Sequence, residues 1–155
     1  MNELIAEIAT IEKLTAQNFQ PYLEMTTIDN VITIAQNLLL SEKNCKIENI
    51  DNRPIYTDIK LLSIAIKNLL DNGIKYGSDK IVKLKTTPEA IEIISKGEQL
   101  KHPLKYYTEP FSQGEKRNSG FGLGLYIVKN ILEKINLKLK YKYEDGYNIF
   151  IIKLV

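Results

Sequence analysis

The segment Leu61 to Gly77 reads LLSIAIKNLLDNGIKYG and has the apolar spacing of a helix with one buried face. Three polar residues, Asn68, Asn72 and Lys75, follow one another at steps of four and three, which places them together on a second face. Asparagine is a poor helix former that normally occupies caps and turns, so two of them in mid-helix indicate a bound ligand. Carboxamide oxygens can coordinate a hard cation such as Mg²⁺, and a lysine ammonium can bind phosphate as a point charge.

A second motif spans Ser119 to Lys129 and reads SGFGLGLYIVK, with glycine at every second position just before an expected helix. Glycine lets the backbone approach a ligand closely, and a helix N-terminus offers free N–H groups and a partial positive charge. The stretch therefore predicts a phosphate cradle, with an ordinary loop as the alternative. Its glycines are Gly120, Gly122 and Gly124.

These motifs resemble those of the sensor histidine kinases. The N box of that family, NLLxNAxKY, is matched by NLLDNGIKY from Asn68 to Tyr76, with Gly73 at the alanine position. The second motif resembles the family's glycine box GxGLGLxIVK, and residues 109–111 read EPF like its F box. The three motifs stand in the family order, and the resemblance covers about residues 26–155.

The resemblance implies the catalytic, ATP-binding domain of a sensor histidine kinase. The implied fold is α+β, a two-layer α/β sandwich with a mixed sheet and an ATP lid, shared with gyrase, chaperone and mismatch-repair ATPases. ATP and Mg²⁺ are the implied ligands. Asn72 would coordinate Mg²⁺ with support from Asn68, Lys75 would contact phosphate, and Tyr76 would pack near the adenine. Asn68 and Lys75 would thus be the catalytic pair. The further nucleotide-binding residues implied are Ser95, Gly97, Phe111, Gly120, Gly122, Leu123 and Gly124.

The residue type at position 68 distinguishes the kinases of this kind from the related hydrolases. Related hydrolases carry glutamate at this position, where it activates a water molecule. Asparagine cannot act as a base near neutral pH, so the site suits transfer of a phosphoryl group better than hydrolysis of ATP.

The match fails at the family's first glycine box, DxGxG, whose aspartate reads the adenine amino group. The corresponding stretch has Ser95 at the aspartate and Gln99 at the second glycine, and only Gly97 is kept. A serine hydroxyl can still accept a hydrogen bond, but the loss of the charge-assisted one costs about 1.5–3 kcal/mol. The sequence therefore predicts weak ATP binding. The alternative is a degenerate module without productive nucleotide binding that acts in protein–protein interaction.

The remaining pattern predicts further elements. Asp58 is expected to cap the Leu61 helix and Gly77 to end it. A long irregular segment at 96–122 is expected to form the lid. Further helices are expected at about 26–40 and 123–135, and strands at 46–50, 55–57, 80–86, 90–95, 137–143 and 147–154.

The N-terminal segment carries Met1, Leu4, Ile8 and Ile11 at the steps of a coiled-coil seam. Such a helix either packs on its own domain or is the end of a longer dimerising helix. We expect residues 1–20 to be the end of the dimerisation and phosphoacceptor helix, and 21–155 to be the ATP-binding domain.

The only histidine, His102, precedes Pro103, which disfavours helix there, whereas the family's phosphoacceptor lies on a long helix. We therefore expect the acceptor histidine to lie outside this chain, which would then be a fragment. The resemblance implies a response regulator as partner and a homodimer through the dimerisation helices.

Composition sets further bounds. A net charge of +2 argues neither for nor against a nucleic-acid partner, and no basic cluster stands out along the sequence, so no nucleic-acid partner is expected. The single Cys45 excludes an internal disulfide and a cysteine-based metal site. No apolar run reaches 18 residues and no signal peptide is present, so no membrane segment is expected here. The expected location is the cytoplasm, as the cytoplasmic part of an inner-membrane sensor.

Overall fold

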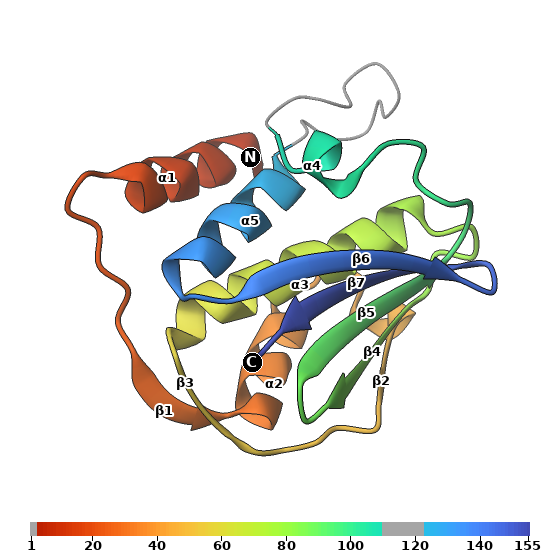
Figure 1. The fold of residues 1–155 in the computed structure, drawn as a ribbon, viewed down its shortest axis with the longest axis horizontal. Coiled ribbons are helices and arrows are strands. Elements are labelled where there is room, and N and C mark those ends of the chain that lie inside the picture. The colour runs from red at the N-terminus through yellow and green to blue at the C-terminus, as the bar shows by residue number, and fades with distance from the viewer. Residues whose placement is uncertain (1–2, 110–122) are drawn as a thin grey trace.

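The structure, a computed structural model, describes residues 3–109 and 123–155. It is a two-layer α+β sandwich in which helices cover one face of a mixed sheet, as the sequence predicts (Figure 1). In chain order the elements are α1 (Glu3–Thr15), β1 (Glu24–Thr27), α2 (Ile28–Asn37), the 3₁₀ turn η1 (Glu42–Asn44), β2 (Cys45–Glu48), β3 (Pro54–Thr57), α3 (Ile59–Tyr76), β4 (Val82–Thr87), β5 (Ala90–Lys96), α4 (Leu104–Tyr107), α5 (Gly124–Lys134), β6 (Lys138–Glu144) and β7 (Tyr147–Lys153).

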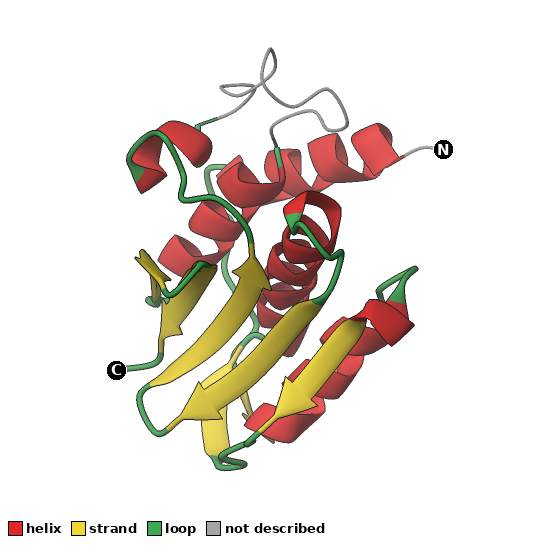
Figure 2. Ribbon diagram, turned by 90° about the vertical axis from the view of Figure 1, so that its right-hand side faces the viewer, coloured by secondary structure: helices red, strands yellow, loops and turns green. Residues whose placement is uncertain are grey.

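The main sheet has the strand order β2-β4-β5-β7-β6. Strands β2 and β4 are parallel and all other neighbours are antiparallel, which makes the sheet mixed. Side chains alternate between its faces: in β4, Val82 and Leu84 are buried while Lys83 and Lys85 point to the other face. The strands lie in front of the helices in Figure 2, which looks onto the open face of the sheet.

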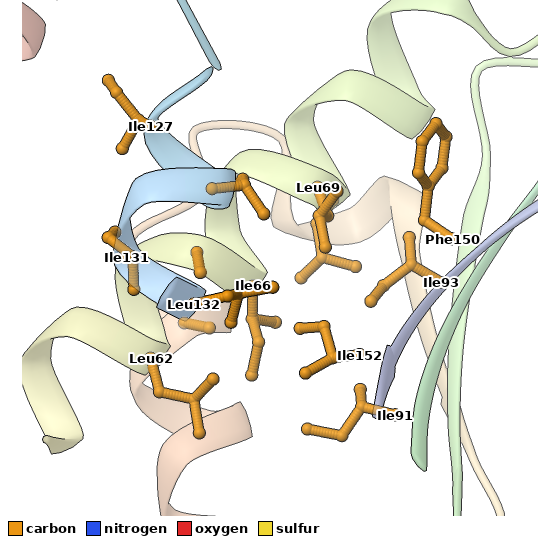
Figure 3. Close-up of a cluster of buried hydrophobic side chains, with 14 of the residues drawn as sticks. Leu62, Ile66, Leu69, Ile91, Ile93, Ile127, Ile131, Leu132, Phe150 and Ile152 are labelled. Carbon is orange, nitrogen blue, oxygen red and sulfur yellow. The ribbon is translucent and has the colours of Figure 1, made fainter. Parts of the chain in front are cut away.

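The core lies between this sheet and the helices. Leu62, Ile66 and Leu69 of α3 meet side chains from β5, β7 and α5 (Figure 3). The partners labelled there are Ile91, Ile93, Phe150, Ile152, Ile127, Ile131 and Leu132. Burying one such side chain contributes about 1.5–3 kcal/mol, so this stripe fixes how α3 is rotated about its axis. That rotation decides which of its residues stay accessible to a ligand.

Helix α1 packs on α5 (Figure 1). Leu14 is fully buried, and Leu4 and Ile11 are partly buried against the core. Ile5 and Ile8 stay 69% and 44% exposed. The N-terminal helix therefore packs on the rest of the domain through one face and keeps two apolar side chains on its outer side, an arrangement compatible with either expectation for this segment.

Four local features differ from the expectations. Strand β1 was not predicted, and it pairs antiparallel with β3 in a separate two-stranded sheet rather than in the main one. Helix α2 is shorter than 26–40: it begins after its N-cap Thr27, which accepts a hydrogen bond from the N–H of Asn30 at 3.2 Å, and it ends at Asn37 with Leu38 as C-cap. Strand β4 begins at Val82 rather than at 80. The short helix α4 lies inside the segment expected to be irregular.

Cys45 is buried at the start of β2. Burial, with a smaller contribution from the charge of Glu42, raises the pKa of its thiol to about 11. The thiol therefore stays protonated and unreactive near neutral pH. In the described ranges, no helix is long and apolar enough to cross a bilayer.

Candidate functional site

Helix α3 is fixed at both ends. The Asp58 carboxylate accepts the N–H of Leu61 at 3.0 Å through Oδ1 and the N–H of Tyr22 at 2.8 Å through Oδ2. At the other end Gly77 is the C-cap, and its N–H donates to the carbonyl of Gly73 at 2.9 Å. Both predicted caps are confirmed. Anchored ends and a buried stripe hold the polar face of the helix in one orientation.

That polar face carries the residues singled out by the sequence. Asn68, Asn72 and Tyr76 are half-buried and Lys75 is exposed. Neither asparagine carboxamide has a hydrogen-bond partner among residues 3–109 and 123–155. Two carboxamide groups with open hydrogen-bonding capacity, one helical turn apart, can accept a ligand without breaking an existing contact.

The end of β5 meets the same part of α3. Ser95 is buried and faces the helix: a Cβ atom built on Gly73 or on Gly77 would lie 3.5 or 3.6 Å from the Ser95 Cβ. A Cβ built on Gly97 would lie 4.0 Å from the carbonyl oxygen of Tyr76. The fold thus brings the predicted nucleotide-binding residues Tyr76, Ser95 and Gly97 together beside the polar face of α3.

A hydrogen-bonded clamp from the β6–β7 hairpin holds the segment after Ser95. Tyr143 donates its hydroxyl proton to the carbonyl of Gly97 at 2.8 Å, and Asn148 donates Nδ2–H to the carbonyl of residue 98 at 2.9 Å. The Tyr141 hydroxyl accepts the N–H of Leu100 at 3.1 Å and donates to Oδ1 of Asn148. These partners lie more than 40 residues away in sequence, and no sequence motif pointed to them.

Burial raises the pKa of Tyr141, while the hydrogen bond from the backbone N–H of Leu100 acts in the opposite direction. The phenol therefore keeps its proton across the neutral range and can go on donating to Asn148. The clamp, defined as Tyr141, Tyr143 and Asn148, fixes the backbone path of residues 97–100.

Of the glycine motif at 119–129, the structure describes only residues 123–129. Gly124 is the first residue of α5, and no atom of the described residues lies within 4 Å of a Cβ built on it. The N-cap residue, Leu123, has no side-chain group that could accept from the first N–H groups of this helix. Leu123 is 2% exposed and belongs to the core, so only its backbone can face a ligand. Phe111, Gly120 and Gly122 lie outside the described residues.

His102 lies in a bend just before α4, not on a long helix. Its side chain is exposed, and its ring centroid is 4.2 Å from that of Tyr106. Neither feature is that of a phosphoacceptor on a dimerisation helix.

Comparison with known proteins agrees with this geometry. Residues 57–154 match the family described as "Histidine kinase-, DNA gyrase B-, and HSP90-like ATPase". The sensor histidine kinase ArsS of Helicobacter pylori is 36% identical over 98% of this chain, and the sensor histidine kinase HprS of Escherichia coli is 30% identical over 82% of it. The chain spans 37% and 29% of the lengths of these two relatives.

Solved structures share the fold. The histidine kinase AdeS of Acinetobacter baumannii superposes with a TM-score of 0.76 at 19% identity, covering 97% of this chain and 76% of that one. The catalytic domain of the histidine kinase ThkA gives a TM-score of 0.71 at 19% identity, covering 86% of this chain and 95% of that one. The chain therefore belongs to the histidine kinase-, DNA gyrase B- and HSP90-like ATPase family, and it carries the ATP-binding fold of the sensor histidine kinases.

Proposed function

We propose that this chain binds Mg-ATP and transfers the γ-phosphoryl group to a histidine outside the chain, from which a response regulator receives it. The observation that carries the proposal is the polar face of α3. Asn68 and Asn72 lie there half-buried, without hydrogen-bond partners in the described part of the chain, on the same helix whose Gly73 and Gly77 face Ser95 at the end of β5.

The donor set fits magnesium. Mg²⁺ is a hard cation that takes oxygen ligands, keeps several waters and shares its remaining positions with substrate phosphates. The carboxamide oxygen of Asn72 would hold the metal with Asn68 in support, and the exposed ammonium of Lys75 would meet the phosphates as a point charge. When bound, the metal would neutralise charge on the phosphate oxygens.

The same residues favour transfer over hydrolysis. Asn68 has no titratable group with which to activate a water molecule. The γ-phosphoryl group of bound ATP would therefore be transferred to an acceptor side chain rather than to water. We place that acceptor on a dimerisation helix of the whole protein, with residues 1–20 as the end of that helix and 21–155 as the ATP-binding domain. Homodimerisation through such helices and a cytoplasmic location, where ATP is available, belong to the same proposal.

Nucleotide affinity is expected to be low. Ser95 stands where the resemblance puts the family's adenine-reading aspartate, its neutral hydroxyl forms a weaker hydrogen bond than a carboxylate, and the loss of the charge-assisted bond costs about 1.5–3 kcal/mol. A loss of that size weakens binding by about 10- to 150-fold. The Ser95 and Gln99 substitutions also motivate the second candidate function, a degenerate module that binds a protein partner instead of nucleotide.

Calorimetric titration with a non-hydrolysable ATP analogue, with and without Mg²⁺, tests the proposal. We expect magnesium-dependent binding in about the high-micromolar range. Asn72→Ala should remove the magnesium-dependent part, whereas Asn37→Ala, the same change at an exposed position on α2, should not alter it. Unchanged affinity in Asn72→Ala would refute the metal assignment. The absence of any binding by the unmodified chain would favour the degenerate module.

A further inference from the structure

The open face of the main sheet is strongly basic. Alternation along the strands places eight lysines and three glutamates on it, a net charge of +5, although the whole chain carries only +2. The rest of the molecule is therefore net negative, at −3. Figure 2 looks onto this face. Its lysines are Lys46, Lys83, Lys85, Lys96, Lys138, Lys140, Lys142 and Lys153, and its acidic residues are Glu48, Glu92 and Glu144.

Most of these lysines are not neutralised by the protein. Three of them pair with the three glutamates at N–O distances of 3.5–4.0 Å, which are long for ion pairs. No carboxylate of the described chain lies within 4.0 Å of the other five, which are Lys46, Lys96, Lys138, Lys140 and Lys153.

Three of the five lysines gather at one corner of the sheet. Lys138 of β6 lies directly opposite Lys153 of β7, and Lys140 follows on the same face of β6. Like charges in directly opposite positions of neighbouring strands repel and destabilise the pair. Together with Asn136, Leu154 and Val155 the three lysines line a hollow of about 350 Å³. That volume is within the range of small-molecule pockets, about 300–1,000 Å³.

We propose that this three-lysine hollow binds a phosphate-bearing anion. An anion placed between the ammonium groups would replace their mutual repulsion by attraction. Lysine binds phosphate as a point charge on a flexible stem, so three of them can converge on one group, and the Asn136 carboxamide adds a further donor. The basic face around the hollow would raise the local concentration of such an anion.

The hollow is separate from the proposed nucleotide site. In the β5–β7 register Lys153 lies opposite Ala90, whereas Ser95, five residues further along β5, lies opposite Asn148. Five residues of a strand span about 17 Å. The two sites are therefore at opposite ends of the same strands and can be told apart residue by residue.

The phosphate can come from a soluble compound or from a lipid headgroup. A second, larger groove of about 640 Å³ shares Asn136, Lys138 and Lys140 with the hollow. Its walls include four leucines, Leu104, Leu132, Leu137 and Leu139. A short acyl chain attached to the phosphate would contact these leucines in the groove, whereas inorganic pyrophosphate would bind in the hollow alone.

The test is an NMR titration of the whole chain at about 0.15 M salt, where long-range attraction is screened beyond about 8 Å. Inorganic pyrophosphate is one probe, and monomeric dihexanoylphosphatidylglycerol is the other, with dihexanoylphosphatidylcholine as its zwitterionic control. We expect shifts of the backbone amides at 136–140 and 153–155. The double variant Lys138→Gln/Lys153→Gln should weaken binding about tenfold or more, because two charge-assisted contacts are lost.

Lys46→Gln is the matched control. Lys46 forms no ion pair within residues 3–109 and 123–155 and lies on the same face, but on β2, four strands from β6 and so about 19 Å away. The affinity of the Lys46→Gln variant for either probe should stay within about twofold of that of the unmodified chain. Binding of pyrophosphate identifies a soluble phosphate ligand, and binding of the anionic lipid alone identifies a headgroup; both support the hollow. An equal loss in Lys46→Gln, shifts confined to 68–76, or no shift with either probe would overturn it.

Discussion

At the residue scale, Gly73 of α3 packs closely against strand β4. A Cβ built on it would lie 2.5 Å from Cγ2 and 3.1 Å from Cβ of Val82 on β4. Alanine is intrinsically better than glycine in a helix by about 1 kcal/mol. Forcing a methyl group against a β-branched side chain that cannot rotate away costs about 1–3 kcal/mol. We expect Gly73→Ala to lower the free energy of unfolding, measured by urea titration.

Val82→Ala is the partner variant for this prediction. Val82→Ala leaves a small cavity on its own, but in the double variant it also removes Cγ2, the atom at 2.5 Å, so that only the milder 3.1 Å contact with Cβ remains. The double variant should therefore be more stable than the sum of the two single losses predicts. Strict additivity would show that the close contact between Gly73 and Val82 does not limit the size of the helix residue.

Ser95 is the residue on which nucleotide affinity should depend. Ser95→Asp restores the family's carboxylate at a buried position beside Gly73 and Gly77. We expect tighter binding of the ATP analogue, by about tenfold or more, through a charge-assisted hydrogen bond. Because a buried carboxylate without a partner is costly, the unliganded variant should also be less stable. Calorimetry and urea titration measure the two effects.

Ser78→Asp is the control for this variant. Ser78 is exposed at the same end of α3, so the substitution adds the same charge without placing it in the proposed adenine pocket. If both variants improve affinity equally, general electrostatics rather than a contact at Ser95 would be responsible. No gain in either would contradict the alignment of Ser95 with the adenine-reading aspartate.

At the element scale, the β6–β7 hairpin supports the segment that follows Ser95. Tyr141→Phe removes the acceptor of the Leu100 N–H and the donor to Asn148. We expect a loss of about 0.5–1.5 kcal/mol in stability and faster hydrogen exchange at the Leu100 amide. Tyr143→Phe, which loses only the bond to the carbonyl of Gly97, should leave that exchange rate nearly unchanged. Equal acceleration in both variants would mean that the hairpin loosens as a whole.

The sequence predicts the longer helices and strands but misses the shortest ones. Helices α3 and α5 and strands β5–β7 were found because apolar spacing and turn residues agree there over seven residues or more. Strand β1 has only four residues, EMTT, with no alternating apolar pattern, and exists because β3 pairs with it. The four-residue α4 is too short for helical periodicity to show.

The residues of the candidate site were likewise predicted from the sequence only in part. Helical spacing alone placed Asn68, Asn72 and Lys75 on one face of α3. The clamp depends on contacts across more than 40 residues, which local patterns do not contain. The basic face was also missed: lysines alternate with apolar residues along separate strands, so no basic cluster stands out in the sequence, and they gather only when strand order and register are known.

At the scale of the whole molecule, α1 joins the domain through α5. Leu14 is fully buried in the common core, and the Lys134 ammonium of α5 lies 6.0 Å from the centre of the Phe19 ring. The N-terminal helix therefore contributes to the same packed unit as the sheet rather than forming a separate one. Its unfolding should be coupled to that of the ATP-binding fold.

Leu14→Ala tests this coupling. Removing a fully buried leucine side chain from a packed core costs about 2–5 kcal/mol, so the urea midpoint of the whole chain should fall in a single transition. Circular dichroism and tyrosine fluorescence should report the same midpoint, because the nine tyrosines are spread along the chain and none lies within α1. Ile5→Ala on the exposed side of α1 should have little effect. If Leu14→Ala instead left the fluorescence midpoint unchanged while helix content fell earlier, α1 would be an independent appendage.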